Sequence, residues 1–221
     1  MSFLALYKPK PLGDSFRAMN PKSTSELSPQ NIWCVGRNYS EHAKEMNAPA
    51  PTEPFIFLKS GGCLDLSNQI VIPTFTQDLH HEVEVVFEID ENLRPSNYGL
   101  GIDLTARDVQ SIAKKEGKPW TLAKSFTGSC KIAFLSKVVE LTEVESTWFS
   151  LKNNGEIRQR GKLQDALFDI GQIVDFLTPR FPIKKGDIVM TGTPSGVSAL
   201  KKGDCVELYW NESKVADWGV I

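Results

Sequence analysis

The sequence lacks the features that mark several large classes of protein. It contains no apolar run approaching the roughly 20 residues that a membrane-spanning helix needs. Its 25 Lys and Arg are balanced by 27 Asp and Glu, which gives a formal charge of −2, and no long basic run occurs. Neither a membrane nor a nucleic acid is therefore an expected partner.

The chain also lacks the common metal-binding, nucleotide-binding and hydrolase motifs. Its four cysteines are widely spaced and form no C-x-x-C pair, and we expect free thiols in a reducing compartment. No G-x-S-x-G, HExxH, G-x-G-x-x-G or Walker loop is present. The first residues lack a secretory h-region, so the cytoplasm is the expected location. A single acidic residue among the first 20 leaves organellar targeting open.

What is present is the composition of a soluble globular domain. Of the 221 residues, 41% are hydrophobic, and 12 Phe with 5 Trp can fill a large core. Residues 1–30 are expected to form an irregular N-terminal segment, because Pro, Ser, Lys and Asn are frequent there. Residues 31–221 contain no linker or repeat and are expected to form a single domain.

Short β-type runs dominate this domain and helical patterns are few. Asn154-Gly155 predicts a two-residue hairpin turn. A helix is expected after Asn38, and another over 105–116, with a Thr105–Asp108 capping box and a stop at Gly117. A third is expected over 169–177, where apolar residues recur at helical spacing. The predicted strands are NIWCVG, PFIFLK, QIVIP, HEVEVVFEID, TWFSLKN, DIVMTG and CVELYW. The pattern predicts a β-rich α+β fold.

Two carboxylates share one face of a predicted strand. The period of two places Glu82 and Glu84 side by side, and from these residues alone a solvent-exposed strand face is the favoured interpretation. Asp103 changes this balance, because it precedes the expected helix and can point back into a cleft. Three carboxylates with waters suit Mg²⁺ or Mn²⁺. His80 falls on the same face and is either a partner of the carboxylates or only a neighbour.

For other polar residues the sequence is consistent both with a functional role and with an ordinary surface or turn position. Arg107 and Gln110 share a helix face, although Arg107 can instead pair with Asp108 at the helix end. His42 and Glu45 are spaced so that the carboxylate can orient the imidazole, yet such pairs are usually solvated. The segment TGTPSGV either presents amides and hydroxyls to an anion or is a simple turn.

Eight pieces occur in a fixed order along the chain: GRNYSEHAKE, PFIFLKS, HHEVEVVFEI, GIDLTARDVQ, WTLAKSF, NNGEIRQRG, KKGDIVMTGTPSGV and KKGDCVEL. This ordered set resembles the fumarylacetoacetate hydrolase family, and most closely its short, single-domain acylpyruvases and oxaloacetate decarboxylases. The resemblance implies a mixed β-sandwich roll, a homodimer and one divalent metal, Mg²⁺ or Mn²⁺, per subunit.

The resemblance also implies roles for individual residues. Glu82, Glu84 and Asp103 match the metal ligands, and Lys124 matches a lysine beside the substrate. The positions that match substrate contacts are Arg37, Arg107, Gln110 and Thr193, and those that match a catalytic dyad on a lid are His42 and Glu45.

The expected activity is hydrolysis of acylpyruvates or decarboxylation of oxaloacetate, both 2-oxo acids, through an enolate that the metal stabilises. In acylpyruvate hydrolysis His42 would activate the attacking water. The alternative is an isomerase or tautomerase of oxaloacetate or of hydroxymuconate-type diacids on the same site. A non-catalytic relative that only binds an anion is a further possibility, which Glu82→Gln would test.

Overall fold

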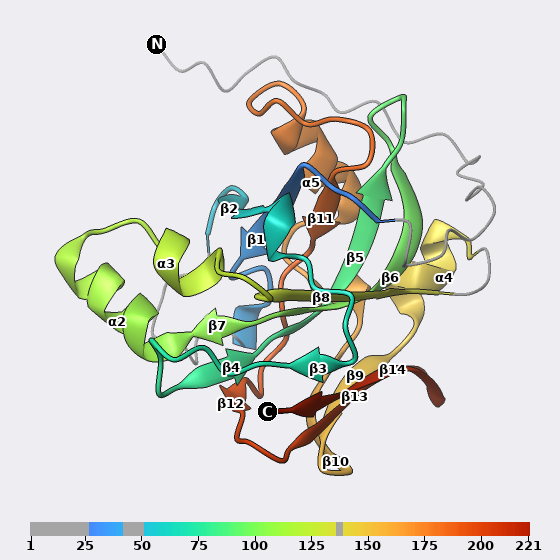
Figure 1. The fold of residues 1–221 in the computed structure, drawn as a ribbon. Helices are drawn as coiled ribbons and strands as arrows, with labels where there is room; N and C mark the ends of the chain where they lie inside the picture. The colour runs from blue at the N-terminus through green and yellow to red at the C-terminus, as the bar shows by residue number, and fades with distance from the viewer. Residues whose placement is uncertain (1–26, 42–50, 136–138) are drawn as a thin grey trace.

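The computed structural model describes residues 27–41, 51–135 and 139–221. Strands outnumber helices in these residues and form two larger sheets and one small one, as a β-rich α+β fold requires (Figure 1). The first sheet has the order β2 (Phe55–Ser60), β1 (Asn31–Gly36), β11 (Ile188–Met190), β5 (Val83–Ile89), β6 (Pro95–Asp103), β8 (Cys130–Phe134).

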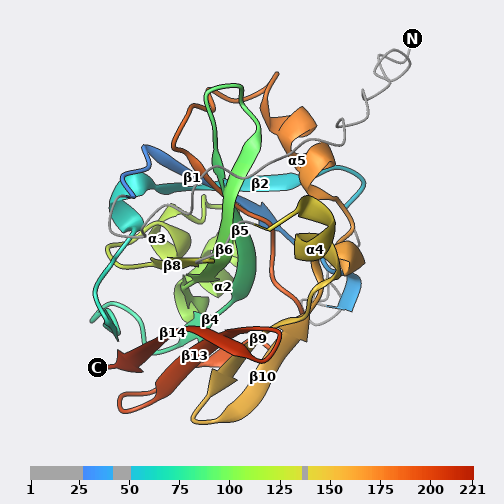
Figure 2. The same ribbon diagram turned by 90° about the vertical axis from the view of Figure 1, so that its right-hand side faces the viewer.

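The second sheet lies across one end of the first, below it in Figure 2. Its order is β10 (Glu156–Gly161), β9 (Phe149–Asn153), β13 (Cys205–Trp210), β14 (Ser213–Val220), β3 (Gln69–Ile70). The small sheet has the order β12 (Ser198–Ala199), β4 (Leu79–His81), β7 (Thr105–Ala106). Asn154 and Gly155 both have positive φ between β9 and β10, which confirms the predicted hairpin turn.

The main core fills the space between the two larger sheets. Val85 and Phe87 of β5 pack there together with Leu151 of β9 and Leu208 of β13. Val86, which points the other way from β5, belongs to a second cluster on the opposite face of the first sheet. The period of two predicted for β5 is therefore confirmed, and the face of Val86 is also the face on which Glu84 lies.

Helices cover the edges of this framework: α2 (Arg107–Glu116), α3 (Thr121–Lys124), α4 (Leu141–Ser146) and α5 (Ile170–Leu177), with 3₁₀ turns η2 (Gly61–Cys63) and η3 (Leu163–Asp165). Gly117 ends α2 with φ +64°, as predicted. The predicted Thr105 capping box is wrong: α2 begins after Ala106, and Thr105 is a residue of β7. The helix expected after Asn38 starts at Ser40, and residues 42–50 lie outside the described ones.

The boundary expected at residue 30 stays a prediction, because residues 1–26 lie outside the described part. No helix of the described residues is long and apolar enough to cross a membrane.

Candidate active site

Three buried carboxylates converge where β5 and β6 pair. Glu82, Glu84 and Asp103 are 5%, 1% and 0% exposed, and each offers an oxygen within 4.8 Å of the others. The strand register produces this meeting, because the Asp103 N–H donates to the Glu82 carbonyl at 2.9 Å. The interpretation of this strand face as solvent-exposed is therefore wrong. The three residues instead form a buried cluster with the hard oxygen donors that Mg²⁺ and Mn²⁺ prefer.

The cluster is electrostatically unfavourable without a cation. Burial, and then the charges of Asp103 and Glu82, raise the pKa of Glu84 well above its ordinary value. The Gly192 N–H donates to Glu84 Oε2 at 2.5 Å, but no lysine or arginine of the described residues pairs with this carboxylate. A divalent ion among the three oxygens would relieve this repulsion, so the donor set fits such an ion.

Lys124, the last residue of α3, brings a buried ammonium group to the same carboxylates. Its Nζ donates to Glu82 Oε2 at 2.8 Å, to Asp103 Oδ2 at 2.5 Å and to Thr105 Oγ1 at 2.6 Å. Burial lowers the pKa of Lys124, but the charges of Asp103 and Glu82 outweigh burial, so the pKa is raised overall. Lys124 is therefore a hydrogen-bond donor and a positive charge in this site.

A second buried lysine, Lys59 of β2, supports the cluster from behind, and the sequence did not reveal it. Its Nζ lies 2.8 Å from Asp103 Oδ1 and donates to the carbonyls of Ser129, Leu104 and Lys124. Lys59 thus holds Asp103 and the backbone of Lys124 in place. The only sequence signal was a lysine at the end of the apolar run PFIFLK.

Arg107 and Gln110 share a face of α2, as predicted, and reach the cluster together. Arg107 donates to Glu82 Oε1 at 2.5 Å and to Gln110 Oε1 at 2.7 Å. The alternative pairing of Arg107 with Asp108 is not found, because Asp108 accepts bonds from Thr76 Oγ1 and the Gln77 N–H instead. Arg107 therefore belongs to the site and not to a surface helix end.

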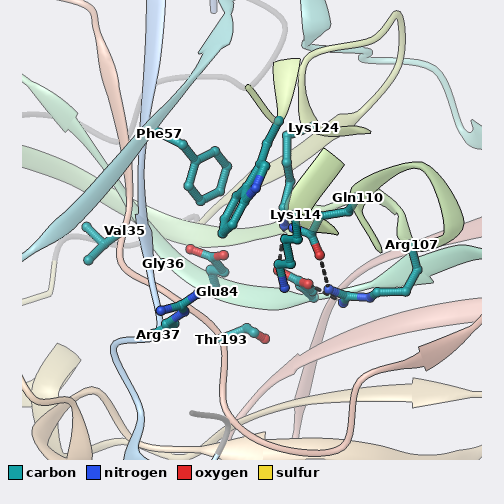
Figure 3. A pocket seen from close by; sticks show the side chains of 12 residues that line it. Val35, Gly36, Arg37, Phe57, Glu84, Arg107, Gln110, Lys114, Lys124 and Thr193 are labelled. Atoms are coloured by element: carbon teal, nitrogen blue, oxygen red, sulfur yellow. Dashed lines mark hydrogen bonds and ion pairs between the residues drawn. The ribbon is translucent and has the colours of Figure 1, made fainter. Parts of the chain in front are cut away.

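A pocket opens beside the carboxylates, and its lining includes the cationic residues Arg37, Arg107, Lys114 and Lys124 (Figure 3). Arg37, which follows β1 with φ 60°, lies over the Phe55 ring at 5.3 Å. Lys114 of α2, which the sequence analysis missed, lies over the Trp120 ring at 5.1 Å. Burial and then the positive charges of Arg107 and Arg37 lower the pKa of Lys114 to about 8.

The TGTPSGV segment after β11 contributes an uncharged side chain to the pocket. Thr193 lines the pocket, and its hydroxyl donates to the Val83 carbonyl at 2.8 Å. Gln159 of β10 donates to this hydroxyl from Nε2 at 2.7 Å. Gly192 has φ +98°, and a Cβ there would lie 2.7 Å from Asn38 Cβ, so the segment requires glycine at this point. The segment is part of the pocket and more than a simple turn.

Two expectations about histidines have different outcomes. His80 accompanies the site as a neighbour: it contacts Asp78 Oδ1 at 2.9 Å and is absent from the pocket lining, although it lies close enough to Glu82 and Arg107 to sense their charges. The His42–Glu45 dyad lies outside the described residues, so its role stays a prediction.

Comparison with known proteins identifies the family to which this site belongs. Residues 31–213 match the model of the fumarylacetoacetate (FAA) hydrolase C-terminal domain. The chain belongs to the fumarylacetoacetate hydrolase family. It is 40% identical over 185 residues to oxaloacetate tautomerase YcgM of Escherichia coli K12, covering 78% of this chain and 84% of the relative.

Other members of the family cover most of the chain as well. A mitochondrial oxaloacetate decarboxylase of Dictyostelium discoideum is 37% identical over 193 residues, covering 80% of this chain and 87% of that protein. The crystal structure of a Pseudomonas aeruginosa fumarylpyruvate hydrolase with Mn²⁺ and pyruvate superposes with a TM-score of 0.80 at 27% identity, covering 98% of both chains. The protein is thus an enzyme of the fumarylacetoacetate hydrolase family, with the fold of its catalytic domain.

Proposed function

We propose that this protein is a divalent-metal-dependent enzyme that interconverts the keto and enol forms of oxaloacetate. The observation that carries the proposal is one pocket in which a carboxylate cluster suited to a metal lies beside four cationic side chains. The relative from Escherichia coli, which covers most of the chain, is named an oxaloacetate tautomerase.

The charges around the pocket suit a small dicarboxylate. Arg37, Arg107, Lys114 and Lys124 line the pocket and provide positive charge on three sides (Figure 3). Lys124 and Arg107 are occupied by the carboxylate cluster, whereas Arg37 and Lys114 make their ring contacts at the mouth. We expect one substrate carboxylate near Lys124 and Arg107, beside the metal cluster, and the second near the other two cations, Lys114 and Arg37.

In this proposal Glu82, Glu84 and Asp103 would hold Mg²⁺ or Mn²⁺. When bound, the cation supplies a Lewis acid that stabilises negative charge on an oxygen of a 2-oxo acid. Lys124 adds a donor and a positive charge beside that oxygen, and Arg107 with Gln110 orients the carboxylate next to it. His42, oriented by Glu45, is the proposed group that moves the proton at C3.

Cleavage of a carbon–carbon bond, either by decarboxylation of oxaloacetate or by hydrolysis of an acylpyruvate, is the second candidate. It is favoured by the relative named an oxaloacetate decarboxylase and by the likeness to a fumarylpyruvate hydrolase. The same residues would stabilise the enolate in each case, and only the acylpyruvate reaction needs an activated water. A homodimer and a cytoplasmic location stay part of the proposal.

An assay that follows enol absorbance and pyruvate release separately distinguishes tautomerisation of oxaloacetate from its decarboxylation. Oxaloacetate is mixed with the protein in Mg²⁺, in EDTA, and in Mg²⁺ with Lys124→Met. We expect metal-dependent loss of the enol without pyruvate, and strong loss of rate in the variant. Pyruvate release as fast as enol loss would favour decarboxylation. No metal-dependent change with oxaloacetate would overturn both the tautomerase and the decarboxylase.

A further inference from the structure

Thr193 has a hydrogen-bonding polarity that the surrounding backbone determines. Two groups fix the side-chain amide of Gln159: the Val83 N–H, which can only donate, bonds to Oε1 at 3.0 Å, and the Pro194 carbonyl, which can only accept, receives Nε2 at 2.9 Å. The amide therefore cannot be flipped. Its second Nε2 proton is directed at Thr193 Oγ1, 2.7 Å away, so this hydroxyl must accept from Gln159.

His81 reinforces this orientation from the far side. Its Nδ1 lies 2.9 Å from Gln159 Oε1, which can only accept, so Nδ1 carries a proton. Its Nε2 contacts Ser198 Oγ at 2.8 Å. A chain of bonds from Ser198 through His81 and Gln159 thus ends at the Thr193 hydroxyl in the pocket.

The hydroxyl proton of Thr193 is also committed. It is donated at 2.8 Å to the carbonyl of Val83, a residue that is 0% exposed. β5 extends past the end of β11, so Val83 has no strand partner on that side. The side chain of Gln159 accepts from its N–H instead, and the Thr193 hydroxyl donates to its carbonyl. Turning the hydroxyl toward a ligand would leave that buried carbonyl without its bond, which is unfavourable.

With these two hydrogen bonds in place, Thr193 Oγ1 retains one lone pair and can only accept a further hydrogen bond. We propose that Thr193 acts toward a ligand only as a hydrogen-bond acceptor, and that it favours a substrate oxygen bearing a proton, the enol hydroxyl, over the keto oxygen or a carboxylate. Gln159 is a positioning residue in this arrangement. The inference rests on the proposed function, because it names the tautomer that the pocket recognises.

The test compares two ligands that differ at this oxygen. Lactate carries a hydroxyl that can donate, and pyruvate carries a keto oxygen that cannot. Dissociation constants are measured calorimetrically with the Mg²⁺-saturated protein, for the wild type, Thr193→Val and Thr193→Ser. We expect Thr193→Val to weaken lactate roughly three- to tenfold more than pyruvate, in line with one lost hydrogen bond. Thr193→Ser should retain most of the preference.

Thr191 provides a matched control on the same segment. Its hydroxyl donates to the Val85 carbonyl at 2.9 Å, it is equally buried, and it does not line the pocket. Thr191→Val removes the same kind of bond to β5 and should leave the ratio of the two dissociation constants unchanged.

Two outcomes would overturn the inference: an equal loss for both ligands in Thr193→Val, or a greater loss for pyruvate, which would make Thr193 a donor. If these occur while the wild type still converts oxaloacetate in a metal-dependent way, only the inference fails. If the wild type shows no such conversion, the proposed function fails first.

Discussion

The two walls of the pocket are built in different ways. The wall on β5, β6, α2 and α3 consists of charged side chains whose carboxylates repel one another until cations join them. The wall on the segment after β11 carries no charged side chain, and its Thr193 hydroxyl is held between the Val83 carbonyl and the Gln159 amide. The charged wall thus has the donors and charges that suit a metal and an anion, whereas the neutral wall offers a fixed hydrogen-bond direction.

This contrast shows how differently the walls depend on their surroundings. Lys59 is the support of the charged wall, because it holds Asp103 and the Lys124 backbone together. Gln159 is the support of the neutral wall, because its amide donates to Thr193 and to the Pro194 carbonyl and accepts from the Val83 N–H. Neither Lys59 nor Gln159 lines the pocket, yet each holds in place residues that do.

The largest effect is expected from removing the support of the charged wall. Lys59→Met leaves a buried carboxylate oxygen and three carbonyls without their ammonium partner, so unfolding free energy should fall by about 3–5 kcal/mol. Urea denaturation measures it. Lys131→Met is the matched control, because Lys131 is as buried but pairs with Asp65, which is 29% exposed and can turn to water. A loss in Lys131→Met as large as in Lys59→Met would contradict this account.

The next effect concerns the metal. Glu84→Gln keeps the shape and an acceptor for the Gly192 N–H but removes a charged ligand. Loss of a residue that only hydrogen-bonds to a metal ligand already lowers metal affinity by about 10–100-fold. Loss of a ligand should therefore lower Mn²⁺ affinity by at least about 100-fold. Titration calorimetry with Mn²⁺ is the measurement. Glu88→Gln, on the same strand and nearly as buried, should bind Mn²⁺ as the wild type does. Equal binding by both variants would remove Glu84 from the metal site.

Removing the support of the neutral wall should cost less. Gln159→Leu leaves the Val83 N–H and the Pro194 carbonyl without a hydrogen-bond partner. We therefore expect a loss of about 2–3 kcal/mol in unfolding free energy. Arg158→Leu, one residue earlier and exposed, should change it by less than about 0.5 kcal/mol. Both are measured by urea denaturation at the same pH. An unchanged free energy of unfolding in Gln159→Leu would show that water or other groups replace the hydrogen bonds of the amide.

The smallest effect is expected at the pocket mouth. Lys114 is charged below its lowered pKa of about 8 and loses its charge above it, so its attraction for an anion should fade as the pH rises from 7 to 9. Lys114→Ala should weaken malate binding roughly two- to fivefold at pH 7 and flatten this pH dependence. Lys115→Ala, its exposed neighbour outside the pocket, is the control. A similar change in both variants would exclude a specific role.

The sequence predicted the charged wall better than the neutral one, for physical reasons. Carboxylates at a spacing of two, and Arg107 with Gln110 at a helical spacing, are chemically distinctive and local in the chain. Lys59 and Gln159 act through partners 34 to 78 positions away, so only the folded structure reveals them. Lys114 is one of two adjacent lysines on α2, and nothing in the sequence distinguishes it from Lys115.

The fold was predicted less completely than the charged residues. β6 was missed because PSNYGLGID carries proline, asparagine and glycines, which are unfavourable in strands. In the structure a Cβ at Gly99 would lie 2.4 Å from the Ala133 carbonyl, and one at Gly101 would lie 2.8 Å from Val86 Cγ1. Close packing between neighbouring strands therefore requires these glycines. α5 was predicted correctly, since the four apolar residues that recur at helical spacing, Ile170, Ile173, Val174 and Leu177, are all buried.

The central claim is that this pocket moves a proton at C3 of oxaloacetate without breaking a carbon–carbon bond. Nuclear magnetic resonance of oxaloacetate in D₂O, with the protein and Mg²⁺, tests it most directly. We predict enzyme-dependent deuterium incorporation at C3 that is faster than pyruvate formation and is abolished by EDTA. Enzyme-dependent pyruvate formation with no exchange at C3 of the remaining oxaloacetate would contradict the claim.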